Sequence, residues 1–148
     1  MIGGGVDHGG MSDAKLRALM GGEVSPLVSA RMGRIKGKDT GPEMIVRRLV
    51  HSLGFRFRLH RRDLPGAPDL VFPARRKVIF VHGCYWHRHS CAVGQRAVRT
   101  RSEFWQLKFH RNVVRDRSNQ NALQRLGWAV LVVWECELRD LSALAEQV

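Results

Sequence analysis

The chain has 148 residues and a mass of 16.8 kDa, the size of one compact domain with a hydrophobic core of its own. It carries 25 lysine and arginine residues against 13 acidic ones, so its formal net charge is +12. No apolar run approaches the ~18 residues of a membrane span, and the first ten residues (MIGGGVDHGG) lack the pattern of a signal peptide, so a cytoplasmic protein without a membrane partner is expected.

The positive charge lies in the middle of the chain. Residues 31–117 carry 21 basic and six acidic side chains, a net charge of +15, whereas the two ends together carry −3. A basic segment with aromatic residues in it is typical of a protein that binds nucleic acid. A solvated basic surface is the alternative interpretation.

The first elements are predicted from caps and glycines. Residues 1–28 are expected to form a loose N-terminal leader, and a short helix is expected from Ser25 to about Ile35, with Pro26 in its first turn. Thr40 and Glu43 match a capping box that begins a second helix, which Gly54 ends. Capping of this helix is therefore enough by itself to explain a glutamate at position 43.

The rest of the chain predicts a mixed α/β fold. Short strands are expected at 55–59, 70–72 and 78–81, and one long helix or two broken ones at 102–126. The apolar run 128–134 is predicted to be a central strand buried on both faces, and a short closing helix is expected at 138–147. This order predicts about four strands in a mixed sheet flanked by helices.

The stretch from His82 to Cys91 holds three histidines, two cysteines and two large aromatic residues. Cys84, His89 and Cys91 read C-x4-H-x-C, and Cys136 can supply a fourth ligand after the later apolar run. Three thiolates and one imidazole form a closed tetrahedral Zn²⁺ site, which would be structural. Three buried thiols packed as small apolar groups are the alternative.

Two histidines of this stretch, His82 and His87, are not needed for zinc. A ring held by a rigid metal loop can act as a general base, and His87 is placed for that role. Asp69 at the start of a strand is a usual position for a ligand of a hard cation, although a Pro-Asp pair alone most often marks a turn. Glu43, Asp69 and the two histidines together have the layout of a metal-dependent nuclease core.

These residues closely resemble the very short patch repair (Vsr) mismatch endonuclease family over about residues 29–140. The resemblance is carried by Arg31-Met-x-x-Ile35, Lys38-Asp-Thr-x-x-Glu43, Leu64-Pro-Gly-x-Pro-Asp69, Val78-Ile-Phe-x-His-Gly-Cys-x-Trp-His87 with His89-x-Cys91, Arg101-x-Glu-Phe-Trp105, Asn112-Val-x-Arg-Asp116, and Leu126-Gly-Trp followed by Val133-Trp-Glu-Cys136. It implies a Vsr-type endonuclease domain at 29–148 with a restriction-endonuclease-like fold. The implied activity is a nick in one DNA strand 5′ to the T of a T:G mismatch left by deamination of 5-methylcytosine.

The resemblance also implies roles for single residues. Asp69 would bind Mg²⁺ with the backbone carbonyl of Val81, and His87 would be the general base. Glu43 and His82 would hold metal-bound waters or the phosphate, and Asp116 would orient a histidine. The superfamily's Glu-x-Lys pair is missing after the Asp, which favours the Vsr branch over a generic restriction enzyme. The four zinc ligands named above match the family's structural zinc site.

Aromatic residues are expected to open the DNA. Tyr85, Trp86 and Trp105 fall where the family inserts a wedge into the base stack beside the mismatch, although position 85 is Tyr rather than Phe. Core packing is the alternative for Trp105. Further predicted DNA contacts are Met32, Ile35, Lys108 and Asn112.

The expected partner is mismatched double-stranded DNA, bound by a monomer in the bacterial nucleoid, with mismatch-repair proteins as further candidates. Two other functions compete with a mismatch endonuclease. A zinc-stabilised DNA-binding module without catalysis explains the charge and the zinc ligands, but not the co-occurrence of Asp69, Glu43 and His87. A restriction-type nuclease that cuts both strands does not explain the aromatic wedge.

Overall fold

The computed structural model describes residue 34 and residues 37–148. Apart from Arg34, the helix predicted at 25–35 lies outside the described residues, as does the predicted leader. The elements in chain order are α3 (Gly41–Ser52), β1 (Arg58–Leu59), β2 (Leu70–Phe72), β3 (Lys77–His82), α4 (Ser102–Arg125), β4 (Ala129–Trp134) and α5 (Leu141–Gln147), with 3-10 turns at Pro73–Arg75 and Glu135–Arg139.

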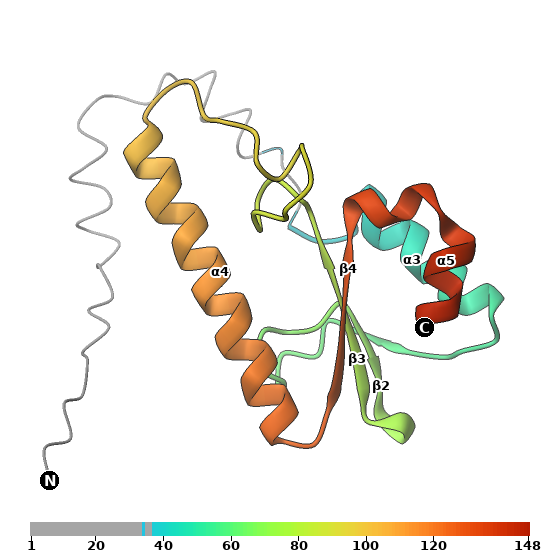
Figure 1. Ribbon diagram of the computed structural model, residues 1–148. Helices are drawn as coiled ribbons and strands as arrows, with labels where there is room; N and C mark the ends of the chain where they lie inside the picture. The colour runs from blue at the N-terminus through green and yellow to red at the C-terminus, as the bar shows by residue number, and fades with distance from the viewer. Residues whose placement is uncertain (1–33, 35–36) are drawn as a thin grey trace, which may run out of the picture. The chain divides into compact units, whose positions relative to one another are not determined.

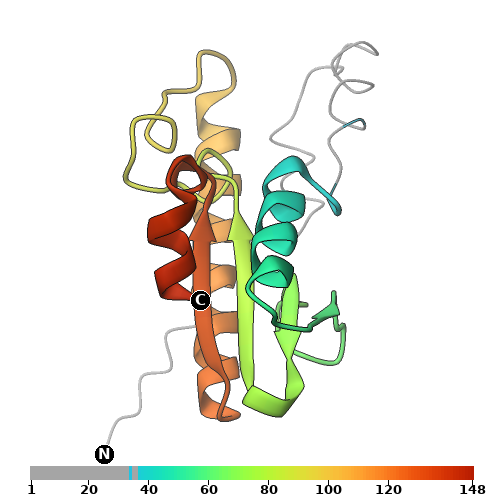
Figure 2. The same cartoon turned by 90° about the vertical axis from the view of Figure 1, so that its right-hand side faces the viewer.

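The sheet is mixed, as predicted. Its order is β1-β2-β3-β4, with antiparallel pairs between the first three strands and a parallel pair between β3 and β4. Helix α4 covers one face, and α3 and α5 cover the other (Figures 1 and 2). Among the helices of the described part, none is both long and apolar enough to cross a membrane.

Apolar side chains of the strands point alternately to the two faces of the sheet, so each face carries a hydrophobic core. Leu70, Phe72 and Ile79 pack with residues of α3 and α5, whereas Val71 and Val78 pack with Leu123 of α4. Successive side chains of a strand point to opposite faces, so three-residue β2 serves both cores. Full burial of one Leu or Val side chain stabilises the folded state by roughly 1.5–3 kcal/mol.

Helix α3 begins where the capping pattern predicts. Thr40 is its N-cap, and its hydroxyl accepts a hydrogen bond of 3.4 Å from the Glu43 N–H. Val46 and Val50 are fully buried and Glu43 is 4% exposed, so all three lie on the face that meets the sheet. The helix therefore presents its first turn, with Glu43, to the sheet.

The structure corrects two predictions about the strands. Residues 129–134 of the predicted run 128–134 form β4, which lies at the edge of the described sheet, and only Val133 in β4 is buried. Its apolar residues pack under helices on both faces rather than between two strands, so β3 takes the central position beside it. The strand predicted at 55–59 shortens to Arg58–Leu59, because Phe55 and Phe57 pack against Phe72 outside the ladder.

Two helix predictions are refined. The segment after residue 101 is one continuous helix of 24 residues, which decides between the two alternatives. The closing helix is shorter than predicted, because residues 135–139 form a 3-10 turn and α5 starts only after Asp140, whose side chain caps it.

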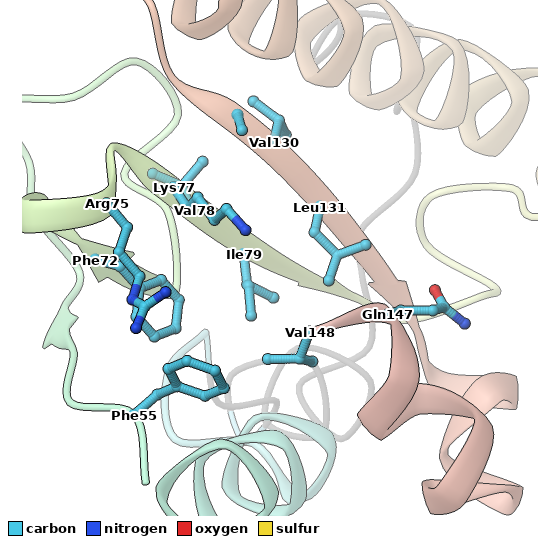
Figure 3. A pocket seen from close by; sticks show the side chains of 11 residues that line it. Phe55, Phe72, Arg75, Lys77, Val78, Ile79, Val130, Leu131, Gln147 and Val148 are labelled. Atoms are coloured by element: carbon cyan, nitrogen blue, oxygen red, sulfur yellow. The ribbon is translucent and has the colours of Figure 1, made fainter. Parts of the chain in front are cut away.

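A pocket of about 240 Å³ lies where β3 and β4 begin, with Phe55, Phe72 and Val148 in its lining (Figure 3). The predicted site residues lie instead where these strands end, at His82 and Trp134. The pocket therefore contains none of the residues that carry the predicted chemistry.

Candidate active site

The carboxylate of Asp69 lies where β2 starts, beside the end of β3. Leu64 and Pro68 are buried and fix the turn that leads to it. Oδ2 of Asp69 accepts a hydrogen bond of 2.7 Å from the backbone N–H of Val81. The N–H and C=O of one residue in an extended strand point to the same side, so the Val81 carbonyl faces the Asp69 side of β3.

This carboxylate is destabilised as an anion. Burial raises the pKa of Asp69 from 3.8 to about 6; the Val81 N–H opposes this rise, and the negative charge of Glu43 adds to it. Hard cations take carboxylate and backbone carbonyl oxygens as ligands. Asp69 and the Val81 carbonyl therefore fit a hard divalent cation, such as the magnesium ion that the resemblance implies, because a cation there would relieve the buried charge.

Glu43 is held by its own helix start and by an arginine. Its Oε1 accepts from the Thr40 hydroxyl at 3.2 Å, and its Oε2 accepts from the Asp39 N–H at 3.0 Å. Arg47, one helical turn later, donates from Nη2 to Oε2 at 3.1 Å. The carboxylate thus caps α3 and also belongs to a charged group beside Asp69.

His82, His87 and Asp116 form a second group on the α4 side. The rings of His82 and His87 stack with centroids 3.9 Å apart and planes 7° apart. Asp116 of α4 contacts Nδ1 of His87 through Oδ2 at 2.5 Å. A carboxylate here favours the tautomer with the proton on Nδ1, which leaves the Nε2 lone pair of His87 available to accept a proton.

His82 is the buried member of this stack and is 6% exposed. Burial lowers the pKa of His82 from 6.5 to about 4, and the nearby His87 adds to the fall. A neutral ring follows at neutral pH, so His82 can accept or donate one hydrogen bond without adding charge. Edge-on packing against Trp134 at 5.3 Å fixes its orientation.

The four predicted zinc ligands come together. The ligand atoms of Cys84, His89, Cys91 and Cys136 all lie within 4.8 Å of one another, and the three thiols are free. Cys91 and Cys136 are only partly buried, which apolar packing of thiols explains poorly. Three thiols and one imidazole fit the ligand set of structural Zn²⁺.

The loop that carries these ligands has little room for side chains. A Cβ at Gly94 would lie 2.0 Å from the backbone oxygen of His89, so only glycine fits there.

Burial raises the pKa of Cys84 to about 12, and a hydrogen bond with His89 lowers the pKa of Cys91 to about 6. Binding of Zn²⁺ would therefore have to release a proton from Cys84.

The predicted wedge residues form one aromatic cluster with Phe109 of α4. Tyr85 lies edge-on to Phe109 at 5.1 Å, and Trp105 lies 5.8 Å from Trp86 and 5.9 Å from Phe109. Phe109 is buried, whereas the other three are partly exposed. Trp105 therefore packs within this cluster and also keeps part of its surface exposed.

Two predicted DNA contacts lie against this cluster. The Lys108 Nζ is 5.0 Å from the centre of the Trp105 ring, and the Asn112 side chain donates to the backbone oxygen of Trp86 at 3.2 Å. Asn112 thus fixes the loop that carries Trp86, a contact that the sequence did not suggest. Met32 and Ile35 lie outside the described residues.

Arg47 and His60 also belong to the site, and sequence reasoning missed both. The His60 ring lies 3.8 Å from Asp69 Oδ1 and 3.7 Å from Glu43 Oε2, measured from Nδ1 and Nε2 respectively. Arg47 Nη2 contacts the His60 Nε2 at 2.9 Å. One signal was available, since Arg47 stands four residues after Glu43 on the same helix, the spacing of an ion pair.

The chain is similar to known DNA endonucleases. Residues 27–93 match the family model described as DNA mismatch endonuclease Vsr. The chain is 54% identical over 113 residues to the Type II nicking enzyme V.XorIIP of Xanthomonas oryzae pv. oryzae, covering 76% of this chain and 82% of that protein. It is 44% identical over 119 residues to the DNA mismatch endonuclease Vsr of Escherichia coli, covering 80% and 76%. It is 38% identical over 117 residues to V.NmeAIP of Neisseria meningitidis, another Type II nicking enzyme, covering 79% and 83%.

Proposed function

Since the chain belongs to the Vsr family of DNA mismatch endonucleases, we propose that it hydrolyses the phosphodiester bond 5′ to the T of a T:G mismatch. The chain is a DNA endonuclease, and the nick in one strand would start very short patch repair. Three relatives carry the name of nicking enzymes or mismatch endonucleases, which favours a single-strand cut over restriction-type double-strand cleavage.

The observation that carries this proposal is the position of two chemical groups at one end of β3. Asp69 contacts Val81 on one side, and His82, the next residue, stacks on the His87 that Asp116 holds. A carboxylate for a cation and a base for water are the two groups that phosphodiester hydrolysis requires. The mixed sheet with helices on both faces also fits a restriction-endonuclease-like nuclease.

Magnesium held by Asp69 and the Val81 carbonyl would neutralise negative charge that develops on the phosphate. His87 accepts a proton from the attacking water at Nε2. Asp116 keeps the other ring nitrogen protonated and stabilises the imidazolium that forms. His82 supports the ring of His87 by stacking and offers a neutral hydrogen-bonding group to the phosphate.

DNA binding rests on charge and on the aromatic cluster. The net charge of +15 over residues 31–117 attracts the phosphate backbone. Tyr85, Trp86 and Trp105 would enter the base stack, which costs least at a mispair, with Lys108 and Asn112 beside them. Met32 and Ile35 would contact the minor groove of the DNA, on the side opposite to these aromatic residues. The cysteine group would hold Zn²⁺ as a structural support for the loop that carries His87.

The protein would act as a monomer on cytoplasmic, nucleoid DNA, and mismatch-repair proteins are candidate partners. The test of the chemical assignment is Asp69→Ala. It should abolish nicking of a T:G duplex in Mg²⁺, while the dissociation constant for that duplex changes little. Nicking at the wild-type rate in this variant would refute the metal assignment, and loss of binding would refute the separation of binding from chemistry.

A further inference from the structure

We propose that Arg47 and His60 are positioning residues of the magnesium site, with Arg47 holding Glu43 and His60 orienting Asp69. The inference rests on the proposed function, because Asp69 is taken as the magnesium ligand. It adds two residues that link the start of α3 to the sheet edge. Together they form a continuous chain of contacts from Glu43 through Arg47 and His60 to Asp69.

Arg47 occupies the place that a cation would take among three neighbouring groups. The ligand atoms of Asp39, Glu43 and His60 lie within 4.8 Å of one another. The guanidinium contacts each of them, at 2.6 Å, 3.1 Å and 2.9 Å respectively. These three side chains are therefore a binding site for Arg47 and not for a second metal ion.

The burial of Arg47 is costly, which argues for a role beyond a surface ion pair. Its side chain is 11% exposed, and its Nε is buried without a hydrogen-bond partner among the described residues. A buried donor without a hydrogen-bond partner destabilises the folded state. The planar fork of an arginine can hold two carboxylates at once, which a lysine cannot reproduce.

The contact with Arg47 favours one tautomer of His60. A guanidinium can only donate hydrogen bonds, so the 2.9 Å contact is a hydrogen bond when the Nε2 of His60 accepts. The neutral ring then has its proton on Nδ1, the atom that lies 3.8 Å from Asp69 Oδ1. The Nδ1 of His60 thus makes an electrostatic contact with one oxygen of Asp69, too long for a hydrogen bond, while the Val81 N–H binds the other oxygen.

The backbone of His60 lies in the left-handed region, with a φ of +45°. This region is uncommon for residues other than glycine, although histidine adopts it more often than most. Residues in sparsely populated backbone regions are often found at functional sites. An oriented carboxylate is what a metal ligand needs, and outer partners of such ligands typically change metal affinity by 10–100-fold.

His60→Asn and His60→Gly form a matched pair that tests this role. Both fit the positive φ, but only asparagine keeps a donor near the position of Nδ1. The full chain, loaded with one equivalent of Zn²⁺, is titrated with Mn²⁺ in place of Mg²⁺, and free Mn²⁺ is measured by electron paramagnetic resonance. The dissociation constant should rise about 10–100-fold in His60→Gly and clearly less in His60→Asn, while the melting temperature without Mn²⁺ stays the same or rises in both.

Unchanged Mn²⁺ affinity in His60→Gly, or equal losses in both variants, would overturn the role of His60. For Arg47, substitution by Lys should retain part of the nicking rate that substitution by Met removes, with the DNA dissociation constant unchanged in both; equal rates in the two would overturn its role. Asp69→Ala serves as the reference variant in the Mn²⁺ titration described for His60. If Asp69→Ala binds Mn²⁺ like the wild type, the metal assignment itself has failed, which is distinguishable from a failure limited to His60.

Discussion

Replacing Asp69 by asparagine should stabilise the protein when no divalent cation is bound at this position. The rise of the Asp69 pKa from 3.8 to about 6 is caused mainly by burial, and it corresponds to about 3 kcal/mol against the charged carboxylate in the folded state. Asparagine is neutral and can still accept the Val81 hydrogen bond. The variant should therefore gain up to about 3 kcal/mol in free energy of unfolding at pH 8, or about 10 °C in melting temperature.

The stability difference between Asp69→Asn and wild type should change with pH in a direction that can be checked. The folded state keeps the Asp69 proton up to about pH 6, whereas the unfolded chain loses it near pH 4. Wild type therefore loses stability relative to the variant as the pH rises from about 4 to about 6, and the difference is full above pH 6. At pH 4 and below the two proteins should differ little.

The assay is thermal unfolding of both proteins at several pH values, in buffer with one equivalent of Zn²⁺ and no other divalent cation. Added Mg²⁺ should raise the melting temperature of wild type but not of Asp69→Asn. Asp63→Asn is the matched control, because a hydrogen bond from Arg61 lowers the pKa of Asp63, so this variant should gain nothing. An Asp69→Asn variant no more stable than wild type at pH 8 would refute the argument that burial prepares this carboxylate for a cation.

Three further predictions concern the other groups of the site. His87→Ala should lower the nicking rate by about 10²–10⁴-fold with mismatch binding retained, and Asp116→Asn should lower it less; full activity in His87→Ala would exclude it as the base. Cys136→Ala should lower zinc content and melting temperature together, and an unchanged zinc stoichiometry would remove this residue from the ligand set. Trp105→Ala should weaken binding of a T:G duplex by about 1–3 kcal/mol relative to the control Phe104→Ala, whereas a lower melting temperature with unchanged affinity would favour core packing.

Local signals made several elements predictable from the sequence. Thr40 and Glu43 specify the start of α3, because the capping contacts involve residues three apart in the chain. Only residues 73–76 separate β2 from β3, so a short connection of this kind favours the antiparallel pairing of the two strands. Cys84, His89 and Cys91 are close in sequence, so their proximity in space was predictable as well.

The predictions that failed depended on packing between distant segments. An apolar run such as 129–134 looks the same whether it lies between two strands or between helices at a sheet edge, so its position in the sheet could not be read from composition. His60 was overlooked because its contact with Arg47 joins residues 13 positions apart across a loop. Nothing in the local pattern of residues 56–62 distinguishes this histidine from a surface residue.

The central claim is tested most directly by one cleavage experiment. An end-labelled duplex with a single T:G mispair is incubated with the protein in Mg²⁺ and in EDTA, in several flanking sequences and beside a T:A control. The account predicts one Mg²⁺-dependent nick, 5′ to the mispaired T, and an intact T:A duplex. Tight binding without a cut in any flanking sequence, or cleavage of both strands of the T:A control, would contradict it.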